Sequence, residues 1–325
     1  MPAALTEVLS EAEAFARRFA GSAHAELVRE AFDDLRDEGR HDRLRTYVHL
    51  PLLLYAALTG DERPARRVAV LCTLVYVGAG ALDDVADGEV SRNWPGRQSD
   101  EVQLFGSFML AVLPLSVVGM LDASVETRSL MYEALVSGFA EMYRGQMQDL
   151  DMARADVADP HVVEASVAAK GGGEIAMFAA LTALCAGADA AVVARCTDFG
   201  RAAGTAAQIA SDCVDLFRSP HSSDLSSGTR SLPIARYLHG LRPTDRKRFL
   251  QQLHEARTDV HSAAAVRREL LDSGVLRYCG FVAGSYVRQA LDALESVARF
   301  AEPGDRLHRW IESYAFARAR SSSAA

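Results

Sequence analysis

Apolar residues recur at three- and four-residue spacing along most of this chain. Such a period places them on one face of an α-helix, which has 3.6 residues per turn. It predicts helices over residues 5–20, 23–35, 68–86, 104–121, 130–150, 162–186, 190–217, 243–273 and 275–300. No segment combines the alternating pattern of a β-strand with a hairpin turn. We therefore expect an all-α protein, a bundle of roughly ten or more helices.

Turn-forming residues separate the predicted helices. They lie at Thr59-Gly60-Asp61, Trp94-Pro95-Gly96, Asp159-Pro160, Ser219-Pro220 and Glu302-Pro303-Gly304. A length of 325 residues is compatible with two domains, but the composition does not change between any two parts of the chain. The sequence predicts a single all-helical domain over residues 1–317, followed by a disordered tail at 318–325.

Composition and charge exclude several classes of protein. The chain is 49% hydrophobic and 24% charged, which is enough apolar material for a large core. Its net charge of −8 argues against a nucleic-acid partner. The uncharged stretch 102–121 is interrupted by Pro114 and two glycines, so we expect buried helices there and no stable membrane insertion. The first residues lack the apolar core of a signal peptide, and a cytoplasmic location is expected.

Three aspartates follow the apolar segment 68–82. Asp83 and Asp87 are four residues apart and share a helix face, and Asp84 lies about 100° from Asp83. Three carboxylates at one helix end repel one another unless a cation lies between them. Oxygen ligands of this kind suit Mg²⁺, which typically combines a few carboxylates with phosphate oxygens and water. The alternative is an ordinary solvated helix end.

A second acidic pair supports the metal hypothesis. Asp212 and Asp215 are three residues apart on a segment rich in small and apolar residues, about 130 residues after Asp83. Two acidic groups on opposing helices can bind several Mg²⁺ ions with a diphosphate between them. The metal ions would then neutralise the leaving group of a reaction in which a C–O bond breaks.

Five sequence elements resemble the polyprenyl synthetase family of trans-prenyltransferases, which includes farnesyl and geranylgeranyl diphosphate synthases. They occur in the family's order: DDVAD at 83–87, GQMQDL at 145–150, KGG at 170–172, the segment 204–215 and DLSSGTRSLP at 224–233. The resemblance implies an isoprenoid-synthase helical bundle around a central apolar cavity. It also implies a prenyl diphosphate substrate, several Mg²⁺ ions per site and a homodimer.

The resemblance also assigns roles to individual residues. The aspartates Asp83, Asp84 and Asp87 stand at the first metal-binding element of the family and are the expected catalytic residues. Asp212 and Asp215 are the expected metal ligands of the second element. The expected contacts to the diphosphate of the substrate are Arg92, Lys170, Arg230 and Gln208.

The departures from the family concentrate where isopentenyl diphosphate binds. Asn93 stands in place of a family arginine, and alignment on Pro51 puts Tyr47 and Leu50 in place of a lysine and an arginine. A family histidine corresponds to Tyr76. Without cationic partners, a diphosphate loses strong charge-assisted hydrogen bonds. Three neighbouring basic residues are candidates to replace them: Arg40, Arg43 and Arg45.

Two further departures touch the other elements, since Ser211 replaces the first aspartate of the second acidic element and Thr229 replaces a lysine. These changes leave several outcomes open. The first is an enzyme that transfers a prenyl group, either by chain elongation or to a non-standard acceptor. The second is a terpene synthase on a prenyltransferase scaffold. The third is a non-catalytic subunit of a heteromeric prenyltransferase. Prenyl transfer is favoured. The Asn/Ser/Glu metal triad of bacterial terpene cyclases is not visible around residues 211–219, and the intact first element argues against a non-catalytic subunit.

Gly78 and Ala79 bear on the length of the substrate. In the family, bulky residues at these places close the pocket and limit the prenyl chain. Small residues here indicate a chain in the C15–C20 class. The alternative is that Gly78 and Ala79 only permit close helix packing.

Overall fold

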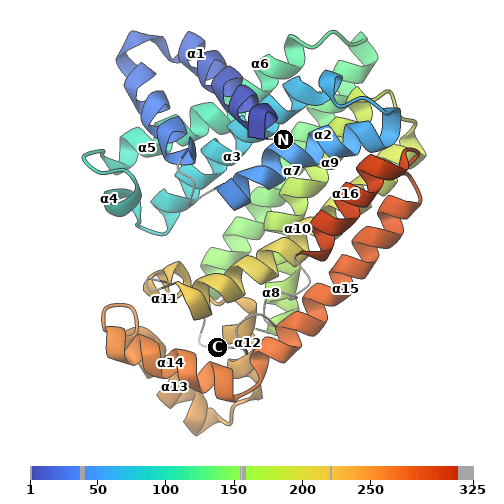
Figure 1. Ribbon diagram of the computed structural model, residues 1–325. Helices are drawn as coiled ribbons and strands as arrows, with labels where there is room; N and C mark the ends of the chain where they lie inside the picture. The colour runs from blue at the N-terminus through green and yellow to red at the C-terminus, as the bar shows by residue number, and fades with distance from the viewer. Residues whose placement is uncertain (1, 37–40, 154, 156–158, 220–221, 314–325) are drawn as a thin grey trace. The chain divides into compact units, whose positions relative to one another are not determined.

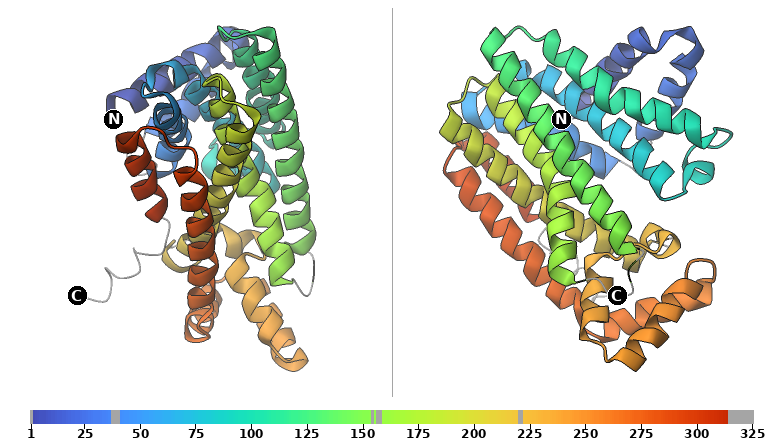
Figure 2. Two further views of the ribbon diagram at one scale, coloured as in Figure 1. Left: turned by 90° about the vertical axis from the view of Figure 1, so that its right-hand side faces the viewer. Right: turned by 180° about the vertical axis from the view of Figure 1, so that it is seen from behind.

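Every regular element in the described part of the chain is helical (Figure 1, Figure 2). The structure, a computed structural model, describes residues 2–36, 41–153, 155, 159–219 and 222–313. The long helices are α1 (Pro2–Arg36), α2 (His41–Thr59), α3 (Arg66–Ala86), α7 (Val125–Ala153), α9 (Gly173–Cys185), α10 (Ala190–Arg218), α13 (Pro243–Glu255), α14 (Val260–Asp272), α15 (Val275–Glu295) and α16 (Ala301–Glu312). The expected all-α class is confirmed.

Shorter helices connect the long ones. They are η2 (Arg63–Ala65), α4 (Val90–Asn93), α5 (Ser99–Ser107), α6 (Leu113–Gly119), α8 (Pro160–Val167), α11 (Ser223–Ser227) and α12 (Leu232–Gly240). Two π-helical segments, η3 (Phe108–Val112) and η4 (Ala168–Gly172), each join a pair of α-helices. π-helical segments are rare in proteins, and those that occur are frequently at functional sites.

The chain packs as two compact units. Unit 1 contains Met1–Leu135, Phe178–Ala194 and Val297–Leu307, and unit 2 contains Val136–Met177, Arg195–Ser296 and His308–Ala325. The chain therefore passes from one unit to the other within α7 and again within α9. The expectation of a single domain over 1–317 stays a prediction, and the expected tail at 318–325 lies outside the described residues.

Helix α3 is the centre of unit 1, where it packs against α1, α2, α5 and α6. Its side chains are buried from Val68 to Val75 because this segment is apolar on all sides. Gly78 lets the neighbouring segment approach closely, since a Cβ atom there would lie 2.5 Å from the backbone nitrogen of Leu110 in η3. The space beside Gly78 is thus occupied by η3 and is not open.

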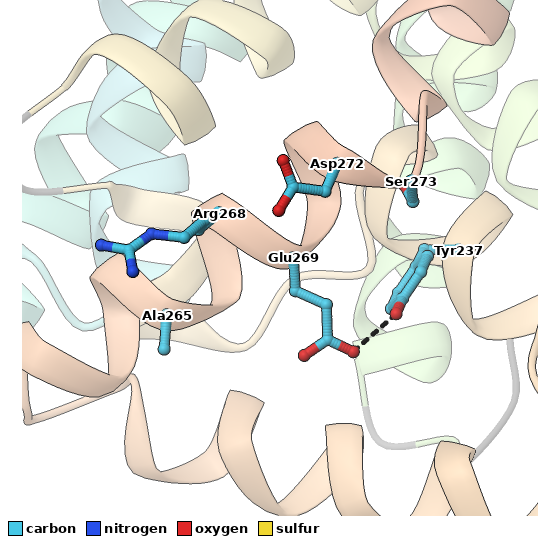
Figure 3. A pocket seen from close by; sticks show the side chains of 6 residues that line it. All are labelled: Tyr237, Ala265, Arg268, Glu269, Asp272 and Ser273. Carbon is cyan, nitrogen blue, oxygen red and sulfur yellow. Dashed lines mark hydrogen bonds between the residues drawn. The ribbon is translucent and has the colours of Figure 1, made fainter.

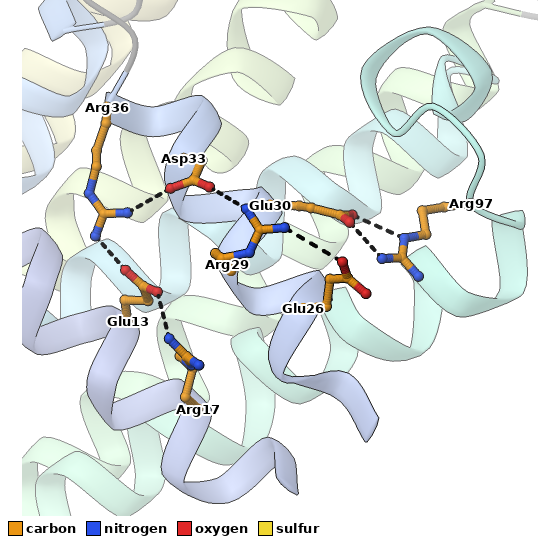
Figure 4. Close-up of polar contacts among 8 residues, drawn as sticks. All are labelled: Glu13, Arg17, Glu26, Arg29, Glu30, Asp33, Arg36 and Arg97. Carbon is orange, nitrogen blue, oxygen red and sulfur yellow. Dashed lines mark hydrogen bonds and ion pairs between the residues drawn. The ribbon is translucent and has the colours of Figure 1, made fainter. Parts of the chain in front are cut away.

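Helix α1 consists of two halves, in agreement with the predicted helices 5–20 and 23–35. They meet at Gly21, whose φ of 67° is outside the helical range. Ion pairs link the halves, with Glu13 bound to Arg36 (Figure 4). On the second half, Glu30 accepts two hydrogen bonds from Arg97, of 3.0 and 2.7 Å, which attach the loop before α5 to α1.

Two cores lie in unit 2. One gathers around Leu216, Leu238, Phe249 and Leu270, and the other around Ile209, Cys213 and Cys279. Helix α10 contributes to both cores, because Leu216 and Ile209 lie on different parts of its buried face. The polar positions of α10 between these apolar residues include Asp212 and Asp215.

The structure differs from the sequence predictions at several helix ends. The predicted helix 243–273 is two helices, α13 and α14, with an interruption around Arg257 to Asp259. The break expected at 302–304 lies in the first turn of α16, where proline is tolerated because the first amides have no helical acceptor. The sequence did not predict α2, α4, α11, α12 and α16.

Three helical stretches are long and apolar enough to cross a membrane by length and composition: Arg63–Ala86, Ser99–Gly119 and Pro160–Cys185. In the most apolar 18 residues of each stretch, the share that is buried inside the protein is 61%, 44% and 61%, respectively. The expectation of buried helices without membrane insertion at 102–121 stays a prediction, since more than half of that window is not buried. Ser99–Gly119 keeps the largest exposed share.

A surface pocket of about 480 Å³ in unit 2 contains none of the predicted site residues (Figure 3). On its wall Glu269 accepts hydrogen bonds from Tyr237 at 2.5 Å and from Arg248 at 2.6 and 3.0 Å. The bond to Arg248 is the main cause that lowers the pKa of Glu269. Burial, followed by the Glu269 hydrogen bond, raises the pKa of Tyr237 to about 12.

We predict that Gly78→Ala lowers the free energy of unfolding by roughly 1–3 kcal/mol, because the added methyl meets backbone atoms that have no room to move. Gly80→Ala on the same helix is the matched control. A Cβ atom at Gly80 meets nothing within 4 Å, so alanine should stabilise the helix by roughly 0.5–1 kcal/mol. Urea unfolding of both variants tests this, and equal effects would contradict the packing described.

We predict that Glu269→Gln loses about 0.5–1 kcal/mol of stability at neutral pH. A carboxylate with a lowered pKa in the folded state stabilises it above its unfolded pKa of about 4.3, and this contribution disappears as the pH falls. The stability of the wild type and the variant should therefore converge below that pH. Thermal unfolding followed from pH 7 to pH 3 measures the difference, and a constant difference would disprove the role of ionised Glu269.

Candidate functional site

The first acidic group lies in the last turn of α3. Asp83 and Asp84 are in the helix, and Asp87 is its C-terminal cap, with its N–H donating to the carbonyl of Asp83 at 2.9 Å. All three side chains are partly buried. Negative charge at a helix C-terminus is unfavourable to the helix dipole, so helix stability does not explain a cluster of aspartates there.

The loop after α3 turns back and holds Asp84. Asn93 Nδ2 donates to Asp84 Oδ1 at 2.7 Å, and Trp94 Nε1 donates to Asp84 Oδ2 at 2.8 Å. Arg92, next to Asn93, is exposed and lies 3.4 Å from Glu89. The structure thus places Arg92 on the same loop that carries the two donors to Asp84.

The second acidic group lies in unit 2, where α7, η4 and α10 meet. Gly145 permits the contact, because a Cβ atom there would lie 2.6 Å from the backbone nitrogen of Lys170. One turn further along α7, Asp149 lies 4.0 Å from Lys170 Nζ. On α10, Gln208 Nε2 donates to Asp212 Oδ1 at 2.7 Å. Two of the expected diphosphate contacts, Lys170 and Gln208, therefore lie with Asp212.

The surroundings of Asp212 disfavour its ionised form. Burial raises its pKa to about 7, the Gln208 hydrogen bond opposes this rise, and the neighbouring charge of Asp149 adds to it. Lys170 lowers the pKa and Asp215 raises it. A cation bound at this place would relieve the cost of ionising Asp212, since nearby opposite charge favours a carboxylate.

Asp215 holds the start of α11. Its Oδ2 accepts from Ser222 Oγ at 2.6 Å and from the N–H of Asp224 at 3.2 Å, and its Oδ1 accepts from the N–H of Ser223 at 3.2 Å. The turn that Asp215 secures places Asp224 near Asp212. Asp215 was expected to be a metal ligand, and in this structure its oxygens already accept three hydrogen bonds.

Asp224 was not among the predicted site residues. Its Oδ2 is buried without a hydrogen-bond partner, and burial, with the charge of Asp212 next in importance, raises its pKa well above the ordinary range. Ser231 is close enough to oppose that rise. A buried carboxylate oxygen with no donor is costly, so this oxygen is suited to a cation. The sequence does mark Asp224, because this residue begins the element DLSSGTRSLP.

Arg230 follows the turn that carries Asp224. Gly228 adopts a φ of 83°, and Arg230 Nη1 donates to the carbonyl of Gly228 at 2.9 Å. The hydroxyl of Thr229 lies 2.8 Å from that of Ser227. Arg230 therefore lies close in sequence to Asp224, on the loop between α11 and α12.

Aromatic side chains occupy the places that the resemblance assigns to isopentenyl diphosphate contacts. The rings of Tyr47 and Tyr76 stack with centroids 4.0 Å apart, and Tyr47 contacts the ring of Phe178 edge-on at 5.7 Å. Leu50 is only 1% exposed. Arg40 and the side chains of Arg43 and Arg45 lie outside the described residues.

No group of three or more His, Cys, Asp or Glu side chains in the described ranges forms a preassembled metal site. This arrangement is compatible with Mg²⁺, which typically takes only one or two protein carboxylates and obtains other ligands from phosphates and water. Asp84, with both oxygens oriented, and Asp224 Oδ2, buried without a donor, are the described atoms that fit such an ion.

The fold is that of known prenyl diphosphate synthases. Geranylgeranyl pyrophosphate synthetase from Pyrococcus horikoshii superposes with a TM-score of 0.80 at 20% identity, over 95% of this chain and 94% of that chain. The enzyme of the same name from Geoglobus acetivorans gives 0.79 at 21%, over 97% and 98%. Decaprenyl diphosphate synthase from Rhodobacter capsulatus gives 0.78 at 16%, over 96% and 97%. These superpositions establish the isoprenoid-synthase fold that the sequence predicted.

Sequence comparison establishes the family. No curated protein matches the chain in sequence. The polyprenyl synthetase model, however, matches residues 27–270, well over half of the chain and all five elements of the resemblance. The expectation of a prenyl diphosphate-dependent transferase of isoprenoid biosynthesis is confirmed at this level. The chain belongs to the polyprenyl synthetase family.

Proposed function

We propose that this chain is a Mg²⁺-dependent enzyme that ionises an allylic prenyl diphosphate of the C15–C20 class and transfers the prenyl group. The observation that carries the proposal is that Asp212 and Asp224 lie close to each other in unit 2, with Asp149 and Lys170 beside Asp212. Carboxylates kept close together and away from water are expensive unless a cation joins them. Membership of the family supports the transfer of a prenyl group.

The chain's own residues divide the work of ionisation. The expected Mg²⁺ ligands are Asp83, Asp84, Asp87, Asp212 and Asp215, and the structure adds Asp224 to them. Asp215 would also keep the turn of Asp224 in place. Bound Mg²⁺ would supply neutralisation of the diphosphate leaving group. Lys170 and Arg92 would donate charge-assisted hydrogen bonds to the diphosphate oxygens, which are stronger than neutral ones. Gln208 and Arg230 would complete the contacts.

The reaction breaks the C–O bond of the allylic diphosphate, and the bonding electrons leave with the diphosphate. The resulting allylic cation needs surroundings that exclude water and stabilise positive charge. The rings of Tyr47, Tyr76 and Phe178 form an aromatic group in unit 1, and a π face stabilises a cation within about 6 Å of its centre. An acceptor then forms the new bond to carbon and loses a proton.

The acceptor is isopentenyl diphosphate or a different, non-standard molecule. The solved structures named above are synthases of long prenyl diphosphates, which supports elongation. A non-standard acceptor is favoured by the lack of cationic side chains at positions 47, 76 and 93. The amide of Asn93 is directed to Asp84, and Tyr47 and Tyr76 form an uncharged stack. No comparison supports a terpene synthase. A non-catalytic subunit would not need the buried carboxylates of unit 2.

The length of the prenyl chain and the assembly are further parts of the proposal. Because η3 occupies the space beside Gly78, Gly78 leaves no room for the prenyl chain. The proposal of a C15–C20 substrate therefore depends on the small side chain of Ala79, which is partly exposed. A cytoplasmic homodimer is supported by the resemblance. Exposed apolar side chains of unit 1 that a second copy would cover lie on α5, η3, α6 and the connection to α7: Leu104, Val112, Leu115, Met120 and Val125.

We predict that the purified protein converts geranyl, farnesyl or geranylgeranyl diphosphate only when Mg²⁺ is present. Asp83→Ala should lower turnover by at least about 100-fold. Removing a residue that hydrogen-bonds to a metal ligand already costs about 10- to 100-fold in activity, and removing the ligand itself should cost no less. Asp292→Ala, an exposed position on α15, is the control and should keep full turnover. Products are read by liquid and gas chromatography with mass detection. Turnover that survives Asp83→Ala would refute the metal assignment.

We predict that Asn93→Arg raises the rate of isopentenyl diphosphate incorporation by about tenfold or more, since a guanidinium adds charge-assisted hydrogen bonds to a diphosphate. Arginine also retains N–H donors that can reach Asp84. The measurement is formation of a longer diphosphate from the allylic substrate with and without isopentenyl diphosphate. If the wild type already elongates efficiently and Asn93→Arg does not improve it, the non-standard acceptor is excluded.

A further inference from the structure

Asp84 is held in one orientation by two neutral donors. The bond from Asn93 Nδ2 is 2.7 Å and the bond from Trp94 Nε1 is 2.8 Å, and they reach different oxygens of the same carboxylate. A carboxylate has about four lone-pair sites, so each oxygen keeps capacity for another partner. Because the donors are uncharged, they fix the carboxylate plane without neutralising its charge.

The donors are themselves anchored to three helices of unit 1. The ring of Trp94 packs edge-on against Phe105 of α5, with centroids 5.6 Å apart. Asn93 ends α4, and its amide also lies 3.4 Å from Glu89. The N–H of Glu89 donates to the backbone carbonyl of Asp84 at 2.8 Å, so the loop is tied to the same turn of α3 that carries the carboxylate.

The loop path depends on two further features. Gly88 has a φ of 73°, which reverses the chain after α3 at little steric cost. Arg97, three residues after Trp94, donates two hydrogen bonds to Glu30 of α1. The orientation of Asp84 is therefore determined by contacts that extend to α1, α4 and α5.

We propose that Asn93 and Trp94 are positioning residues that orient Asp84 for Mg²⁺ binding. The proposal rests on the function proposed above and deepens it. Partners that fix the orientation of a metal-binding carboxylate typically change metal affinity by about 10- to 100-fold when removed. Asp84 also lies in the last turn of α3, where the two donors fix the plane of its carboxylate.

The proposal gives position 93 a role other than substrate binding. An amide that donates to Asp84 on α3 acts on the metal side of the reaction. Trp94 follows it and uses its single indole N–H for the same carboxylate. The two residues act together, since each one satisfies one oxygen of Asp84.

The decisive experiment is calorimetric titration of Mg²⁺, with inorganic pyrophosphate present, into the wild type and three variants. Trp94→Phe keeps a ring against Phe105 but removes the N–H, and Asn93→Ala removes the other donor. We expect each to raise the Kd for Mg²⁺ by about 10- to 100-fold. Trp310→Phe makes the same exchange at the other tryptophan of the chain and should leave the Kd unchanged.

The possible results separate the two proposals. If Trp94→Phe and Asn93→Ala bind Mg²⁺ as tightly as the wild type and only unfold more easily, the two residues merely anchor the loop, and the positioning role is wrong. If the wild type itself binds no Mg²⁺ with pyrophosphate, the proposed function fails together with this inference. Should Asn93→Ala not fold, Trp94→Phe alone decides the matter, because its shape is nearly preserved.

Fluorescence provides an independent reading at Asp84. The chain has two tryptophans, so in Trp310→Phe the emission comes from Trp94 alone. Mg²⁺ with pyrophosphate should change this emission, because a cation on Asp84 alters the charge at the acceptor of the indole N–H. The change should vanish when Asp84→Asn is added. An emission change that persists in that double variant would show that Trp94 does not report on Asp84.

Discussion

Repulsion between carboxylates that share a small, poorly solvated space is the constraint on which the candidate site depends. In unit 2, burial is the first cause that raises the pKa values of Asp212 and Asp224, the charges of neighbouring aspartates add to this rise, and Lys170 opposes it at Asp212. In unit 1, three aspartates lie at the helix end where negative charge is least favourable. Under the proposed function, both arrangements would become favourable when divalent cations and a diphosphate bind between the carboxylates.

Close backbone packing makes these charges meet. Gly145 allows α7 to touch η4, and this contact brings Asp149 to Lys170. Asp215 secures the start of α11 and thereby places Asp224. On the other unit, the loop after α3 closes back on Asp84 through Asn93 and Trp94. In each case a contact from a neighbouring residue determines where a carboxylate of the candidate site lies.

The sequence was sufficient for the helical class, the family and the two acidic elements, because helical periodicity and the spacing of Asp83 to Asp87 are local properties. It was insufficient where a residue's role depends on the path of a loop. Asn93 was interpreted only as a lost arginine, although its amide holds Asp84. Asp224 begins the element DLSSGTRSLP, but its place near Asp212 depends on the hydrogen bonds that Asp215 accepts from the start of α11. Gly78 left two interpretations open, and only the approach of η3 favours packing.

The most direct test of this account is a crystal structure of the protein with Mn²⁺ in place of Mg²⁺ and with inorganic pyrophosphate, in which anomalous scattering locates the metal ions. We expect metal ions with carboxylate ligands from α3, including Asp83 or Asp87 with Asp84 kept in its present orientation, and from Asp212 or Asp224 in unit 2. Metal ions that contact neither acidic group, or pyrophosphate bound without any metal ion, would contradict the account.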